Sequence, residues 1–140
     1  MNGLFLEDLA VGQWAELERR VTSQDIAAFA AVTGDDNPVH LDERYAAATA
    51  FGGRIAHGML SAGYISAVIG TRLPGPGAIY VSQSLRFRRP VRIGDAVTAR
   101  AEVSAVDLAR GRVSLATRCV VGGKVVVEGE AEVMVPRRRA

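Results

Sequence analysis

The chain has 140 residues, of which 49% are hydrophobic and 23% charged. This length and composition predict one globular domain over residues 1–140, with a core that needs no disulfide or metal. The net charge of +2 gives no sign of nucleic-acid binding, and the single cysteine excludes an internal disulfide and a cysteine-built metal cluster. There is no long apolar run and no signal-peptide pattern, so we expect a cytoplasmic protein that does not bind membranes.

Helix signals occupy the first half of the chain. Thr22 and Asp25 have the spacing of a capping box, and the helix that follows should end at Gly34. Asp42 is placed to cap a second, short helix over residues 43–50, which Gly52-Gly53 should end. A third helix is predicted over residues 57–73. It is apolar or small nearly all the way round, which indicates a buried helix.

Strand signals occupy most of the second half. Five segments have the alternating or β-branched pattern of strands, namely residues 13–21, 78–87, 95–106, 112–121 and 124–135. The last two are joined by the turn signal Gly122-Gly123. Short connections favour an antiparallel sheet of about five strands, and the apolar helix must pack on it, so the fold class is α+β.

The densest group of chemically active residues lies at 33–40, where the sequence reads TGDDNPVH. Glycine, asparagine and proline predict a turn between helices. Such a turn can aim Asp35 and His40 at one water, and this pair can remove and return a proton near neutral pH. The plainer interpretation is that the aspartates make turn contacts and that His40 is a satisfied, partly buried residue.

A second chemically active segment begins the apolar helix. Gly58 follows His57 there, so a substrate carbonyl could approach an exposed backbone N–H group. The helix dipole favours negative charge at this end, which suits an oxyanion or an enolate. Alternatively, Gly58 only permits close packing, and His57 caps the helix or packs nearby.

Together the two segments resemble the MaoC-like, (R)-specific enoyl-CoA hydratase family of the hot-dog fold. The family motif is an aromatic residue followed by Gly-Asp-x-Asn-Pro-hydrophobic-His, and it stands here at residues 29–40. It continues as IAHGML at 55–60 and LPGPGAIYVSQSLRFRRPV at 73–91. The likeness covers nearly the whole chain. It is greatest to the short bacterial hydratases that feed polyhydroxyalkanoate synthesis.

The resemblance implies a long apolar central helix wrapped by the sheet, and reversible hydration of trans-2-enoyl-CoA to (R)-3-hydroxyacyl-CoA. Asp35 and His40 match the catalytic pair, and Gly58 matches the glycine whose N–H meets the thioester oxygen. Ser66 matches a serine of the active-site region, and Asn37 the asparagine that helps to fix the turn. We expect His40 to take the water proton, while Asp35 orients the water and helps to protonate C2. No metal or other cofactor is implied.

The resemblance also implies partners. Family members pair through their sheets, so we expect a homodimer or a higher homo-oligomer. The acyl chain would enter an apolar tunnel near the central helix. The arginines between residues 86 and 92 are candidates for contacts with coenzyme A phosphates, or they form a solvated strand edge. The arginines at 137–139 should form a frayed tail, and Cys119 should be inert packing.

Three other functions remain open at this point. The first is a dehydratase for another acyl thioester, carried on acyl-carrier protein or formed from a branched or dicarboxylic acid. The second is binding of acyl-CoA without catalysis, which the acid/base pair and the oxyanion donor argue against. The third is thioester hydrolysis, which the Asp-x-Asn-Pro-Val-His spacing fits less well than hydration.

Overall fold

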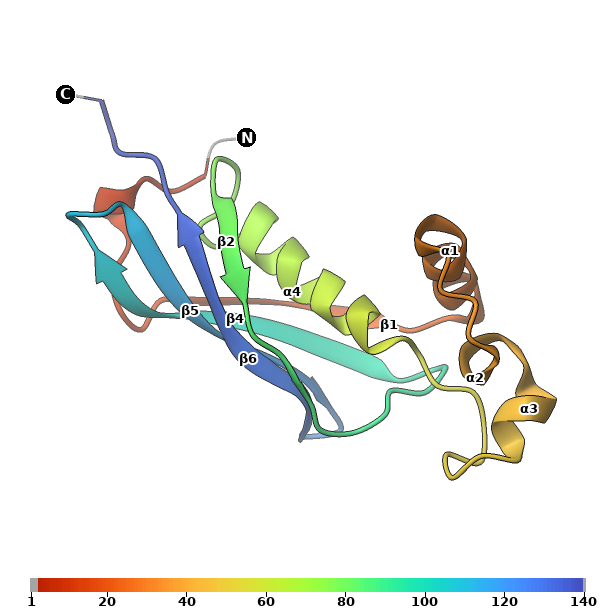
Figure 1. Cartoon of the computed structure of the whole chain (residues 1–140). Coiled ribbons are helices and arrows are strands. Elements are labelled where there is room, and N and C mark those ends of the chain that lie inside the picture. Colours follow the sequence, from red (N-terminus) through yellow and green to blue (C-terminus); the bar gives the residue numbers. More distant parts are fainter. Residues whose placement is uncertain (1–2, 140) are drawn as a thin grey trace.

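The computed structural model describes residues 3–139 (Figure 1). In chain order the elements are the 3-10 helix η1 (Leu6–Asp8), β1 (Trp14–Arg20), α1 (Ser23–Thr33), α2 (Pro38–Leu41), α3 (Glu43–Ala47), α4 (Gly58–Thr71), β2 (Ile79–Gln83), β3 (Arg86–Phe87), β4 (Ala96–Asp107), β5 (Arg112–Val121) and β6 (Lys124–Met134). None of the helices in this described part of the chain is long and apolar enough to cross a membrane.

The strands form one antiparallel sheet in the order β1-β4-β5-β6-β2, and β3 also pairs with β6. The sheet has six strands instead of about five because the segment at 78–87 is interrupted near Ser84. There the chain passes so close to β6 that a Cβ on Gly129 would lie 1.8 Å from the Ser84 carbonyl oxygen. A glycine in β6 therefore permits the approach that separates β2 from β3.

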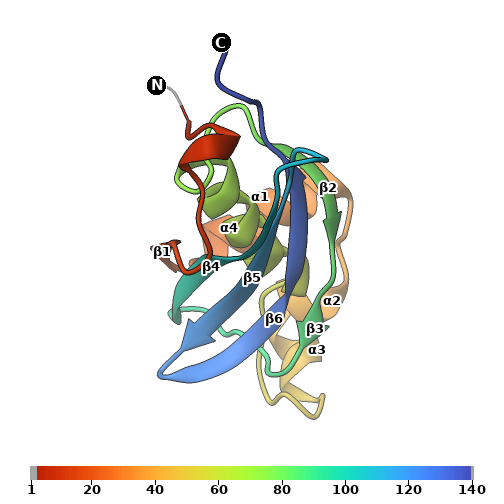
Figure 2. The ribbon, with the colours of Figure 1, turned by 90° about the vertical axis from the view of Figure 1, so that its left-hand side faces the viewer.

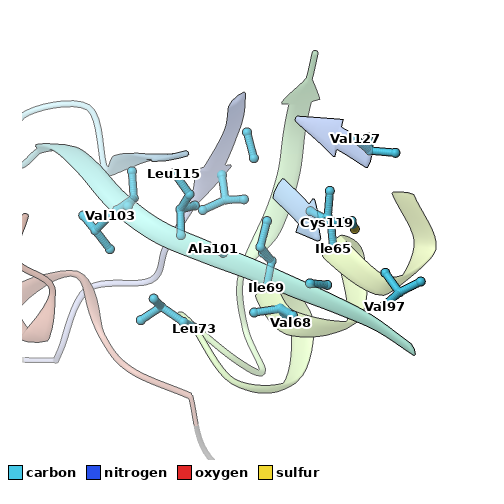
Figure 3. Close-up of a cluster of buried hydrophobic side chains, with 14 of the residues drawn as sticks. Ile65, Val68, Ile69, Leu73, Val97, Ala101, Val103, Leu115, Cys119 and Val127 are labelled. Carbon is cyan, nitrogen blue, oxygen red and sulfur yellow. The ribbon is translucent and has the colours of Figure 1, made fainter. Parts of the chain in front are cut away.

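Helix α4 packs against the sheet, and the strands curve around it (Figures 1 and 2). Its buried side carries Ile65, Val68 and Ile69. These side chains meet residues of β4 and β5 such as Val97 and Leu115 in a continuous apolar core (Figure 3). The α+β class predicted from the sequence is confirmed. The third helix is present as α4, but it is buried on one side only instead of all round, since Met59 and Ser66 are exposed on the side that the sheet does not cover.

The short helices α1, α2 and α3 gather beside the beginning of α4, away from both termini (Figure 1). As predicted, Thr22 and Asp25 form a capping box at the start of α1, and Gly34 ends this helix with a φ of 81°. Asp42 caps α3, whose end at Ala47 comes earlier than the sequence pattern suggests. The single turn of helix α2 lies where only a turn was predicted.

The C-terminal arginines differ from the prediction of a frayed tail. Arg138 pairs with the carboxylate of Asp8 at 2.8 Å, and its backbone N–H donates to Glu7. The Arg138 guanidinium holds the pKa of Asp8 below its usual value. Arg137 donates to the carbonyl of Ala109 at 3.2 Å. The prediction is wrong for these two residues because the C-terminal segment lies against the start of the chain and against the turn between β4 and β5.

Candidate active site

The turn between α1 and α2 orients the carboxylate of Asp35. The side chain of Asn37 caps α2 by accepting a hydrogen bond from the backbone N–H of Val39 at 3.2 Å. The backbone N–H of Asn37 donates to Oδ1 of Asp35 at 3.4 Å. Asp35 itself is exposed. The turn therefore holds a solvent-accessible carboxylate in one orientation without enclosing it.

His40 lies in α2 with 8% of its surface exposed. Its Nδ1 is 2.8 Å from the carbonyl oxygen of Ile55. Because a carbonyl oxygen can only accept a hydrogen bond, Nδ1 carries the ring proton and the neutral ring keeps its lone pair on Nε2. The guanidinium of Arg54 donates from Nε to the backbone carbonyl of His40 at 2.7 Å. Both the ring and the backbone of His40 are thus held by the segment that precedes α4.

The second histidine, His57, belongs to the same cluster, although only a capping or packing role was predicted for it. Its ring stacks on that of His40, with centroids 3.9 Å apart and ring planes at 28°. Its Nε2 is 2.9 Å from the backbone carbonyl oxygen of Asp35. Ring or carboxylate atoms of Asp35, His40 and His57 lie within 4.8 Å of one another. One feature of the sequence could have pointed to His57 as part of the site: the chain has only two histidines, and each lies inside a chemically active segment.

Asp35, His40 and His57 have the atom types of a metal site, but their geometry fits one poorly. Metal ligands converge on a point, whereas the nearly parallel rings of the two histidines direct their in-plane lone pairs side by side. The cluster is therefore better suited to proton transfer than to coordination.

A pocket of about 330 Å³ extends from His40 to Gly58, the first residue of α4. Its walls are largely apolar, with Phe51, Ile55, Phe87 and Val127 among the lining residues. The N–H groups of the first helical turn have no acceptor within their own helix, so that of Gly58 is available to a ligand. The pocket can thus bring an apolar chain and a carbonyl group next to His40, while Asp35 is not among the residues that line it.

Gly58 also has a steric reason to be a glycine. A Cβ at this position would lie 2.6 Å from two atoms of the Phe87 ring. Contacts of that length do not occur between carbon atoms at rest, so any larger residue would displace the ring or the helix start. The glycine therefore leaves the N–H accessible at the place where Phe87 approaches the helix.

The structure brings Asp35, Asn37, His40 and Gly58 to the same end of the fold, but it does not place Ser66 with them. Ser66 lies on the exposed side of α4, outside the residues that line the pocket. From the same helix, Ser61 is 2% exposed and lines the pocket. The sequence offered no reason to distinguish Ser61 from the other small residues of this helix.

The arginines after β2 line two surfaces, and Arg88 lines both. Arg88 and Arg89 line the pocket, where Arg88 pairs with Glu128 at 3.5 Å and Arg89 donates to a backbone carbonyl at 2.6 Å. Arg86 and Arg88 also line a groove of about 760 Å³ between the strands, which carries both arginines and glutamates. Arg88 and Arg89 are therefore the candidates closest to a ligand in the pocket.

Known proteins are similar to this chain along most of its length. A family model described as MaoC like domain matches residues 10–126. The (R)-specific enoyl-CoA hydratase of Rhodospirillum rubrum is 57% identical over 134 residues, covering 96% of this chain and 93% of the relative. The 3-hydroxybutyryl-CoA dehydratase of Methylorubrum extorquens is 55% identical over 135 residues, covering 96% and 86%.

The fold of this chain is also similar to that of a solved structure. The (R)-hydratase from Aeromonas caviae, described as involved in PHA biosynthesis, matches with a TM-score of 0.90 and 47% identity, covering 93% of this chain and 99% of that one. The hot-dog fold expected from the sequence is thereby confirmed. Because the family model matches most of the chain and the relatives are similar along nearly all of it, the chain belongs to the MaoC-like domain family.

Proposed function

We propose that the protein is an (R)-specific enoyl-CoA hydratase, a hydro-lyase that adds water reversibly to trans-2-enoyl-CoA. The observation that carries the proposal is the clustering of the Asp35 carboxylate with the His40 ring, which faces the same pocket as the first residue of α4. Relatives named (R)-specific enoyl-CoA hydratase and 3-hydroxybutyryl-CoA dehydratase support it, since hydration and dehydration are the two directions of one reaction.

We propose one role for each group. Nε2 of His40 takes a proton from a water that Asp35 orients, and the oxygen of that water forms a bond to C3 of the enoyl group. The C2–C3 π electrons move toward the thioester, and the N–H of Gly58 stabilises the negative charge that develops on its oxygen. The proton then returns to C2 with the help of Asp35, which leaves a 3-hydroxyacyl thioester. Asn37 acts by holding the turn that carries Asp35.

The proposal includes a homodimer. Strand β2 is an edge of the sheet, and its residues Ile79, Tyr80 and Val81 are 60%, 38% and 43% exposed. An uncovered edge with three consecutive apolar or aromatic residues favours pairing with a second copy.

Ser66 is exposed on α4, so a contribution of Ser66 to a site requires an assembly that covers this side of the helix. Coenzyme A as carrier and a cytoplasmic location stay predictions.

The test is the loss of the conjugated enoyl-thioester absorbance when purified protein is mixed with crotonyl-CoA. Asp35→Asn removes the carboxylate with little change of shape, and we expect it to lower the rate by about 100-fold or more. Asp36→Asn is the matched control, because Asp36 is the neighbouring exposed carboxylate and makes no side-chain hydrogen bond within residues 3–139. It should retain the wild-type rate. A stereospecific dehydrogenase then checks that the product is the (R) isomer.

Two outcomes would contradict the proposal. If the protein hydrates neither crotonyl-CoA nor longer enoyl-CoA substrates, the alternative is a dehydratase for acyl-carrier-protein thioesters or an acyl binder. If Asp35→Asn and Asp36→Asn lose activity equally, the loss reflects the charge of the turn rather than the chemistry of Asp35. Circular dichroism of both variants excludes unfolding as the cause.

A further inference from the structure

We infer that His57 is a positioning residue that fixes Asp35 through a hydrogen bond from its ring to the Asp35 backbone carbonyl; this rests on the proposed hydratase function. The His57 ring is 2% exposed, and its Nε2 is 2.9 Å from that carbonyl oxygen. Since the carbonyl can only accept, Nε2 donates and Nδ1 keeps the lone pair of the neutral ring. The bond joins the N-cap of α4 to the turn that carries the carboxylate.

The position of His57 links three parts of the site. Its ring contacts that of Phe29 of α1, at a centroid distance of 4.6 Å, and that of His40 of α2, at 3.9 Å. The next residue along the chain is Gly58, which carries the N–H proposed to meet the thioester oxygen. A shift of His57 would therefore move the carboxylate, the histidine base and the oxyanion donor relative to one another.

Packing alone does not explain why a histidine is buried at position 57. Its Nδ1 is buried and finds no hydrogen-bond partner among the described residues. Leaving a buried polar atom unpaired costs about 1–3 kcal/mol, whereas an apolar side chain of similar size would fill the same space without that cost. The hydrogen bond to Asp35 is what an apolar residue could not supply. We therefore take this bond as the reason for a histidine at this position.

The decisive experiment compares His57→Gln with His57→Met. Both side chains are unbranched and of similar length, and both lose the ring that stacks on His40. Only glutamine keeps an N–H group near the place of Nε2, so a difference between the variants reports the hydrogen bond. A misplacement of about 1 Å in a catalytic group can reduce a rate by about 100-fold. We expect kcat for crotonyl-CoA to be at least about 10-fold lower in His57→Met than in His57→Gln, with similar KM values.

A second measurement does not depend on turnover. The ¹³C shift of the Asp35 carbonyl and the ¹⁵N shift of the Asp36 amide respond to a hydrogen bond at that carbonyl. They should remain near their wild-type values in His57→Gln and move in His57→Met. If His57→Met does not fold, His57→Asn replaces it, because the shorter amide reaches the place of Nδ1 and not that of Nε2.

The outcomes separate this inference from the proposed function. Equal kcat values for the glutamine and methionine variants of an active enzyme would overturn the positioning role and leave the hydratase function intact. If the wild-type protein has no hydratase activity, the proposed function fails, and the NMR shifts alone decide whether His57 holds the Asp35 turn. Equal shifts in the two variants would then overturn it.

Discussion

Replacing Gly58 with alanine tests the proposed oxyanion donor and its packing at once. An added Cβ would lie 2.6 Å from Cδ1 and Cε1 of Phe87, whereas carbon atoms in contact rest about 3.5–4.0 Å apart. The ring or the helix start must therefore move by about 1 Å. Phe87 is 56% exposed on a two-residue strand, so its ring will yield more readily than the start of α4.

The same geometry sets the expected magnitudes. Alanine suits a helix better than glycine, and the displaced ring is half in solvent, so the free energy of unfolding should change by less than about 1 kcal/mol. In contrast, the new methyl group occupies the approach to the N–H of Gly58. Loss of an oxyanion donor costs about 100-fold or more in rate. A 100-fold decrease corresponds to about 2.7 kcal/mol of transition-state stabilisation.

The assay is the initial rate of crotonyl-CoA hydration for Gly58→Ala, Phe87→Ala and the double variant, with thermal melting as the control for folding. If displacement of the ring contributes to the loss, removing the ring makes room for the methyl group, so the double variant should be more active than the product of the single effects predicts. A Gly58→Ala rate within about threefold of the wild type would refute the reasoning that a side chain at this position blocks the approach to the N–H.

The other predictions concern different parts of the molecule. Arg54→Met removes the donor to the His40 backbone carbonyl, so kcat should decrease by about 10-fold with little change in KM, and an unchanged kcat in steady-state kinetics would contradict this positioning. Burial raises the pKa of the Cys119 thiol to about 12, so this thiol stays protonated in the folded chain at a pH where it ionises in the unfolded chain. The free energy of unfolding should therefore decrease as the pH rises from about 9 toward 12, by up to about 1.4 kcal/mol per pH unit. Denaturant titrations should show a smaller decrease for Cys119→Ala, and equal slopes would exclude Cys119 as the source. Val81→Lys places a charge on the uncovered edge strand β2 and should convert the proposed dimer to monomer in sedimentation velocity, whereas a variant that still dimerises would place the interface elsewhere.

Much of the local structure could be predicted from the sequence because its signals act over a few residues. The capping box of α1, its glycine end and the alternation of β4 and β5 are local patterns, and each corresponds to an observed element. The sequence pattern predicted one strand over residues 78–87, whereas the structure has two, β2 and β3. The reason is that its interruption depends on Gly129, which is distant in sequence and becomes a neighbour only through strand pairing.

By itself the sequence determined the fold class and pointed to Asp35, His40 and Gly58, because residue types and short spacings carry that information. Only the tertiary structure decided what surrounds these residues. It placed His57 against His40 and Asp35, put Ser61 rather than Ser66 in the pocket wall, and set Phe87 against Gly58. These contacts join helices and strands that are far apart along the chain, and packing of α4 on the sheet determines which of their side chains meet.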